Sequence, residues 1–162
     1  MQKFISNNLS DFEFHDALVK NSCIDNNGNL NFEIKHLNIH KNIQQNPHDI
    51  DMEIDLANIV FTDFKLMSYK HGGAKVYNDK GQFLYDDPSY TLTDTNGLKA
   101  FEKVLNESFT ILYLSDENSI GYIEGCGLDP YFIINFTFSN VTITWEKLAD
   151  KAWYEKRKIK YP

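Results

Sequence analysis

Arginine is nearly absent from this chain of 162 residues, in which Arg157 is the single copy. Proteins that grip nucleic-acid phosphates use arginine forks and clustered lysines, so this scarcity argues against direct nucleic-acid binding. The charge is also uneven, because residues 145–162 carry six basic and three acidic side chains within a net charge of −7. Residues 1–144 carry ten basic and twenty acidic side chains, and this excess of acidic groups would attract a basic partner.

Cysteine and long apolar runs are scarce as well. Cys23 and Cys126 lie far apart without CxxC spacing, which predicts two reduced thiols in a cytoplasmic protein. Residues 1–16 lack the apolar run of about seven residues that a signal peptide needs. No stretch approaches the roughly 20 apolar residues of a membrane helix. We therefore expect a cytoplasmic chain that does not bind membranes.

Aromatic residues, by contrast, make up 14% of the chain, with twelve Phe and nine Tyr. Aromatic side chains pack well on a pleated surface, so this richness favours strands. Hydrophobic residues contribute 42% and charged residues 24%, as in ordinary globular proteins. The length suits one core, and we expect residues 1–162 to form a single domain.

Three segments have the pattern of β-hairpins. Residues 17–34 alternate apolar and polar side chains on both sides of an Asn-Asn-Gly-Asn turn, and Asn-Gly is a strong hairpin signal because both residues tolerate positive φ. In the first strand the alternating positions are Ala17, Val19 and Cys23. Residues 74–87 and residues 109–125 are the other two hairpins, with expected turns at 78–81 and 116–118.

One helix is expected over residues 96–107, capped by one of residues 94–96. Its apolar side chains share one helical face: Leu98, Phe101, Val104 and Leu105. Residues 132–138 and 141–145 alternate as two further strands, with Asn140 at a turn or bulge between them. Residues 145–157 fit either a second helix or an irregular segment that tucks Trp153 under the sheet.

The order of these elements predicts an α+β fold that is mainly β. Without βαβ alternation there is no reason to expect a parallel sheet. We expect a bent antiparallel sheet, a two-layer sandwich or a half-barrel, with one or two helices packed on it. Residues 156–162 form a basic tail whose order the sequence leaves open, as it does the oligomeric state.

The adjacent His15 and Asp16 raise the question of a metal site. A metal-dependent hydrolase would use this pair together with His48 and Asp49, which follow a proline in a polar segment. The structural alternative places His15 and Asp16 on opposite faces at the start of a strand, with one side chain bonded to a backbone group. We favour the structural alternative and expect no metal, no cofactor and no catalytic residues.

Two other motifs have a structural interpretation. Cys126 lies between glycines without a nearby cation that would lower its pKa, so we expect a buried or half-buried thiol. The segment KHGGAK, residues 70–75, has a glycine pair but no Walker spacing, and it is interpreted as a turn or a mobile loop.

The most informative motif is DIDMEIDL, residues 49–56, in which carboxylates alternate with apolar residues. On a strand, Asp49, Asp51, Glu53 and Asp55 would share one face and repeat about every 7 Å. Such a row of carboxylates is able to engage a cationic protein surface. The same pattern is more often that of a solvated face or of a charged edge strand.

Both ends of the chain resemble small bacterial immunity proteins of polymorphic toxin and contact-dependent inhibition systems. The resemblance rests on the run Phe14-His15-Asp16-Ala17, on Val141, Ile143 and Trp145, and on the run Ala152-Trp153-Tyr154-Glu155. It implies a cytosolic, non-enzymatic protein that binds one toxin domain and blocks it. It transfers no catalytic residues.

The combined expectation is an immunity protein whose acidic surface occludes a basic, nuclease-type toxin. Carboxylates would occupy the site where substrate phosphates bind. The alternatives are a small-molecule module, with a ligand pocket lined by phenylalanines, and the hydrolase described above. The predicted toxin-binding residues are Asp49, Asp51, Glu53, Asp55, Tyr85, Asp86, Asp87 and Tyr90.

Overall fold

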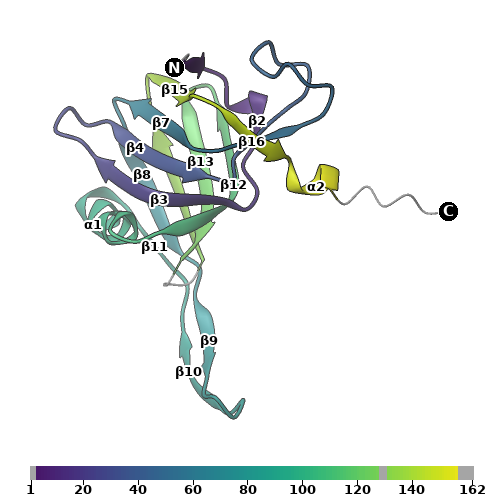
Figure 1. Ribbon diagram of the computed structural model, residues 1–162. Coiled ribbons are helices and arrows are strands. Elements are labelled where there is room, and N and C mark those ends of the chain that lie inside the picture. Colours follow the sequence, from purple (N-terminus) through teal and green to yellow (C-terminus); the bar gives the residue numbers. More distant parts are fainter. Residues whose placement is uncertain (1–2, 128–130, 157–162) are drawn as a thin grey trace.

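The computed structural model describes residues 3–127 and 131–156, so most of the predicted basic tail lies outside the described residues. A ten-stranded antiparallel sheet dominates the fold (Figure 1). Its strands, in chain order, are β1 (Phe4–Ser6), β3 (Ala17–Ile24), β4 (Leu30–Lys35), β7 (Ala57–Thr62), β8 (Lys65–His71), β11 (Tyr90–Leu92), β12 (Phe109–Glu117), β13 (Ile120–Cys126), β14 (Phe132–Thr137) and β15 (Asn140–Trp145). The spatial order is β1-β15-β7-β4-β3-β12-β13-β14-β8-β11, and the sheet does not close. The expected mainly-β fold is confirmed.

Two smaller sheets and the helices complete the structure. One small sheet has the order β16-β6-β5-β2, and the other is the hairpin β9-β10. The remaining elements are η1 (Leu9–Asp11), β2 (Phe12–Glu13), β5 (Asn38–Ile39), β6 (Met52–Ile54), β9 (Ala74–Tyr77), β10 (Phe83–Asp87), α1 (Asp94–Leu105), β16 (Leu148–Lys151) and α2 (Trp153–Lys156). Within the described residues, neither helix has the length and apolarity to span a membrane.

The large sheet bends over itself around an aromatic core. The rings of Phe61 on β7 and Phe136 on β14 lie 5.1 Å apart, although four strands separate β7 from β14 in the sheet. Helix α1 packs against the same core through Phe101, whose ring contacts Phe64 and Phe132. The edge-to-face contact of Phe61 with Phe136, at 83°, adds to the free energy gained by burial.

The Asn-Gly turn forms as predicted. It is held by side-chain hydrogen bonds that the alternation of apolar and polar residues does not reveal. The Asp25 carboxylate accepts hydrogen bonds from the backbone of Asn27 and Asn29, and Gly28 adopts φ 79°. These bonds, led by that from Asn29, hold the pKa of Asp25 below its usual value. A register shift between Val19 and Asn21 then turns Cys23 towards solvent, against the simple alternation expected for β3.

The other elements lie near their predicted positions. The turn of the β12–β13 hairpin falls at Asn118 and Ser119, with φ 51° and 62°, slightly later than expected. Such paired positive φ values match the right-handed twist of the strands. Helix α1 begins two residues earlier than expected at Asp94, and its predicted apolar face packs on the core. Cys126 is half-buried as expected.

The C-terminal segment differs from both expectations. Trp145 ends β15, and Leu148–Lys151 forms β16, which pairs with β6. The backbone N–H of Ala152 donates to the carbonyl of Asp51, and only the single turn Trp153–Lys156 is helical. The helical spacing of this segment was misleading because backbone pairing with β6 determines its conformation.

Candidate protein-interaction site

A hairpin projects from the end of the large sheet, and we call residues 74–87 the arm. Strands β8 and β11 belong to the large sheet, whereas their continuations β9 and β10 pair only with each other. Figure 1 shows the arm extending away from the remainder of the molecule. The hairpin predicted for residues 74–87 is therefore confirmed, and all of it lies outside the large sheet.

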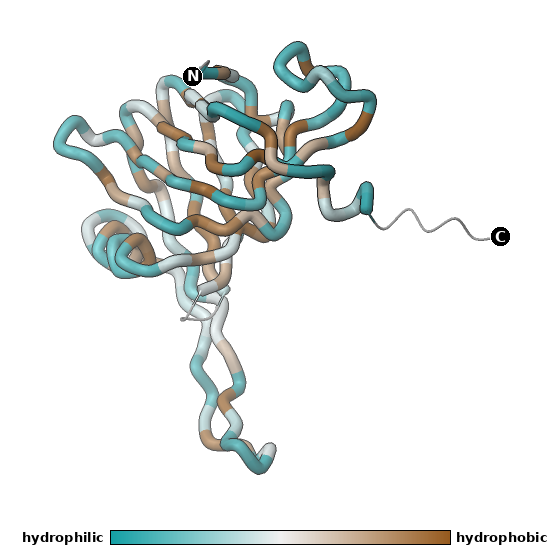
Figure 2. Tube along the Cα trace, in the orientation of Figure 1, coloured by the Kyte–Doolittle hydropathy of each residue, from teal (hydrophilic) through white to brown (hydrophobic). Residues whose placement is uncertain are grey.

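The arm exposes large apolar side chains. Tyr77, Phe83, Leu84 and Tyr85 are 54%, 53%, 55% and 57% exposed, and Tyr90 at the base is 46% exposed. These five are the majority of the nine large hydrophobic side chains that are exposed among the described residues. In Figure 2 hydrophobic positions alternate with hydrophilic ones along the arm. Clustered exposed apolar groups of this kind mark interaction surfaces.

Hydrogen bonds of Asn78 order the tip of the arm. Its side-chain oxygen accepts from the backbone N–H groups of Lys80 and Gln82, both at 2.9 Å. Its amide nitrogen donates to Gln82 Oε1 at 2.8 Å, and Gly81 adopts φ 75°. The tip is therefore pre-organised before any partner arrives.

Two glycines at the base allow close backbone approach. A Cβ on Gly73, which has φ 74°, would lie 2.6 Å from the Ser89 nitrogen and 2.7 Å from the Asp87 oxygen. A Cβ on Gly72 would lie 2.5 Å from Tyr131. The glycine pair in KHGGAK thus lets the chain cross from the sheet into the arm, which fits neither a phosphate loop nor a simple turn.

His71 fastens the base of the arm to the sheet. Its Nε2 lies 2.6 Å from Asp87 Oδ2, and its ring stacks on Tyr90 with 4.8 Å between centroids. The imidazole is almost fully buried, whereas the Asp87 side chain is 33% exposed. Sequence reasoning did not single out His71, because only the pairing of β8 with β11 brings it opposite Tyr90 and the sequence carries no local signal for that pairing.

The acidic segment 49–56 is only partly the strand that was expected. Strand β6 covers Met52–Ile54 alone, with Met52 and Ile54 buried as predicted. The carboxylate of Asp51 accepts hydrogen bonds from Tyr154 Oη at 2.7 Å and from the Lys41 backbone N–H at 2.7 Å, and it lies 3.0 Å from His40 Nδ1. Burial acts to raise the pKa of Asp51, but these hydrogen bonds outweigh it and lower that pKa.

Two of the other three carboxylates also have partners inside the chain. Glu53 lies 2.8 Å from His36 Nδ1, and Asp55 pairs with Lys147 at 2.9 Å. The hydrogen bond and charge of Lys147 lower the pKa of Asp55. Asp49 is exposed. These carboxylates therefore connect β6 to neighbouring segments, and they do not form a free acidic row.

The structure does not bring the two predicted halves of the interface together. Tyr85, Asp86, Asp87 and Tyr90 lie on the arm and at its base. The sheet that contains β6 lies at the opposite end of the molecule (Figure 1). A single contact surface made of residues 49–55 and residues 85–90 is therefore not present.

His15 and Asp16 lie in a turn just before β3, and not on opposite faces of a strand: both side chains are exposed, and His15 Nε2 lies 3.7 Å from Asp16 Oδ1. Only the expected contact of one side chain with a backbone group is confirmed. The ring nitrogen Nδ1 of His15 lies 3.0 Å from the Leu112 carbonyl oxygen, and the exposed Asp16 adopts φ 68°. In residues 3–127 and 131–156, no three His, Cys, Asp or Glu side chains converge as metal ligands. His48 and Asp49 do not join His15 and Asp16 in such a group.

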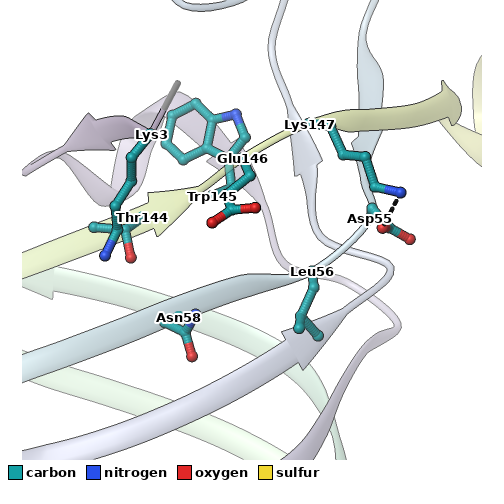
Figure 3. Close-up of a pocket in the computed structure, with 8 residues that line it drawn as sticks. All are labelled: Lys3, Asp55, Leu56, Asn58, Thr144, Trp145, Glu146 and Lys147. Atoms are coloured by element: carbon teal, nitrogen blue, oxygen red, sulfur yellow. Dashed lines mark ion pairs between the residues drawn. The ribbon is translucent and has the colours of Figure 1, made fainter. Parts of the chain in front are cut away.

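Polar residues line the hollow shown in Figure 3. This hollow has a volume of about 280 Å³, and it includes the ion pair of Lys147 and Asp55. Its lining residues are Lys3, Asp55, Leu56, Asn58, Thr144, Trp145, Glu146 and Lys147. No phenylalanine contributes to this hollow. Phe32 and Phe109 each line another hollow of the surface, but their rings pack against other phenylalanines in the core.

Comparison of the chain with protein-family models, with curated proteins and with solved structures found no match.

Proposed function

We propose that this protein is an immunity protein that binds a bacterial toxin domain and blocks it by placing the arm in the toxin's substrate cleft. The observation that carries the proposal is the arm itself, a pre-organised hairpin with exposed aromatic side chains. A two-stranded hairpin is marginally stable alone in water, and exposed apolar groups on it gain free energy when a partner buries them.

The shape of the arm suits occlusion of a cleft. Residues 74–77 of β9 extend about 14 Å at about 3.4 Å per residue, before the tip is counted. Tyrosine and phenylalanine are the residue types that anchor protein interfaces when they enter well-packed pockets. Because Asn78 and Gly81 already order the tip, little conformational entropy is lost on binding.

Charge supports a basic toxin as the partner. The net charge of −7 complements a nuclease-type domain, whose substrate site is positively charged. Asp51, Glu53 and Asp55 are engaged inside the chain, so we assign the contact to the arm, with Asp86 exposed beside the aromatic anchors. The overall charge then accelerates encounter, and the arm determines the lifetime of the complex.

The proposal requires a toxin gene next to the gene of this chain, and the test measures binding to, and protection from, the domain of that toxin. In the double variant Phe83→Ser/Leu84→Ser, affinity falls at least about a hundredfold if each anchor contributes about 1.5 kcal/mol. The control Ile5→Ser/Met67→Ser changes side chains of similar exposure outside the arm, at 51% and 48%. The proposal fails if both variants bind like the wild type, or if they lose affinity and protection equally.

A further inference from the structure

Three tyrosines surround one carboxylate on the outer face of the large sheet. Glu124 on β13 lies opposite Tyr113 on β12, and Tyr122 precedes it by two residues on the same face. Tyr131 leads into β14, whose Ile133 pairs with Glu124. We call these four residues, Tyr113, Tyr122, Glu124 and Tyr131, the tyrosine cage.

Hydrogen bonds hold the carboxylate in place. The hydroxyl of Tyr122 donates to Glu124 Oε1, and the Glu124 carboxylate lies close enough to the Tyr131 hydroxyl to raise the pKa of that tyrosine. Both phenol hydroxyls are neutral at physiological pH, and burial together with the Glu124 carboxylate raises the pKa of Tyr122 and Tyr131 further above the usual value. The Tyr113 ring lies 5.9 Å from the Tyr122 ring at 65° and is 53% exposed, which leaves one aromatic face of the cage accessible.

Glu124 has no counter-ion among the described residues. None of the six ion pairs found there includes it. Lys70, which pairs across β14 with Ile133, lies two strands away, at about 10 Å for strands about 4.8 Å apart. A partly buried anion that is held by neutral donors is complementary to an external cation.

The free acceptor sites of Glu124 and the exposed ring of Tyr113 favour some cations over others. A carboxylate has about four acceptor sites, and two phenol hydroxyls leave room for further N–H donors. A planar guanidinium is able to stack on the Tyr113 ring while it donates to Glu124, whereas a quaternary ammonium has no N–H to donate. We propose that the tyrosine cage binds the guanidinium of an arginine side chain presented by the partner protein.

The position of the cage connects it to the arm. The backbone N–H of Gly72, at the base of the arm, donates to the Tyr131 carbonyl at 2.6 Å. A toxin domain that encloses the arm down to its base would therefore have its surface beside Tyr131. This inference rests on the proposed function for the identity of the partner, but not for the chemistry of the site.

The first test uses N-acetyl-arginine amide as a probe and follows backbone amide resonances by NMR. We expect saturable shifts at residues 113, 122, 124 and 131, and none with the neutral isostere N-acetyl-citrulline amide. Replacing Glu124→Gln keeps the acceptor oxygen and removes the charge, and it should weaken the probe about tenfold. Equal shifts with both probes, or no shifts with either probe, would overturn the proposal that the tyrosine cage binds a guanidinium.

A matched variant controls for net charge. Glu33 lies on β4, is partly exposed and accepts a hydrogen bond from Asn21 at 2.9 Å, so Glu33→Gln makes the same charge change elsewhere. We expect this control to bind the probe within about twofold of the wild type, since it is remote from the cage. Equal weakening by Glu33→Gln and Glu124→Gln would show non-specific attraction and overturn the assignment.

The second test uses the toxin domain and separates this inference from the proposed function. Glu124→Gln should weaken toxin binding about tenfold, with Glu33→Gln as the control. Unchanged toxin binding in Glu124→Gln would overturn the assignment of the arginine to the partner, even where the arm variants lose binding. Loss of probe binding in Glu124→Gln supports guanidinium binding by the tyrosine cage, even if the arm variants bind the toxin normally.

Discussion

The hydroxyl of Tyr154 donates a 2.7 Å hydrogen bond to Asp51, a residue 103 positions earlier in the chain. This contact ties α2 to the segment that leads into β6, beside the backbone bond between Ala152 and Asp51. An apparently solvent-directed carboxylate is thus a central acceptor of the small sheet. Its role in stability is separate from the binding role of the arm, and the two are tested by different variants.

Replacing Asp51→Ala should lower the free energy of unfolding by about 2–4 kcal/mol, because three donors lose their acceptor. The control Asp49→Ala changes an exposed carboxylate two residues earlier and should stay within about 0.5 kcal/mol. Urea unfolding at neutral pH measures both. Equal stability of the two variants would mean that the hydrogen bonds to Asp51 contribute nothing net.

The lowered pKa of Asp51 predicts a specific acid response. Because the pKa is lower in the folded than in the unfolded state, the stabilisation is complete above the unfolded value of about 4 and is lost as pH falls through the folded value. The variant Asp51→Asn should therefore show a shallower loss of stability below about pH 4. Urea midpoints measured from pH 7 to pH 3 check this, and parallel curves for the two proteins would contradict it.

Gly97 in α1 provides a test of close packing. A Cβ there would lie 2.9 Å from the Leu92 carbonyl oxygen, which belongs to backbone and cannot rotate away. Alanine improves helix propensity by about 1 kcal/mol, but the clash should outweigh that gain and leave Gly97→Ala destabilised by about 1–2 kcal/mol. The exposed neighbour in Asn96→Ala should be neutral or slightly stabilising when measured by the same thermal unfolding. A stabilised Gly97→Ala would show that α1 is free to shift away from β11.

Order at the tip of the arm should affect affinity without affecting stability. Asn78→Ala removes the acceptor for the N–H groups of Lys80 and Gln82, so the arm must be ordered on binding. We expect toxin affinity to fall about tenfold, mainly through faster dissociation, with the unfolding midpoint unchanged. Surface plasmon resonance measures this, with the exposed Asp79→Ala as the control. Similar dissociation rates for the two variants would show that the tip is ordered by other contacts.

The features of the fold that the sequence predicted correctly were those that a pattern among neighbouring residues indicates. Alternation and Asn-Gly chemistry located the hairpin of β3 and β4, and the spacing of Leu98, Phe101 and Leu105 located α1. The register shift that exposes Cys23 has no local signal, because it depends on pairing with β4.

The candidate site was predictable only in part. The sequence indicated a hairpin over residues 74–87, but whether other strands flank it depends on where β14 begins. The carboxylates of residues 49–55 were expected to be free because alternation shows which residues share a face, and not what lies across from them. Their partners Tyr154 and Lys147 are about a hundred residues away in the chain, beyond the range of any periodic pattern.

Hydrogen exchange of the backbone amides, with and without the toxin domain, tests the central claim most directly. The account predicts that amides of residues 74–87 exchange readily in the free protein and become strongly protected in the complex. Amides of the small sheet formed by β16, β6, β5 and β2, at the other end of the molecule, should be unchanged. A complex in which the small sheet gains protection and the arm does not would contradict the account.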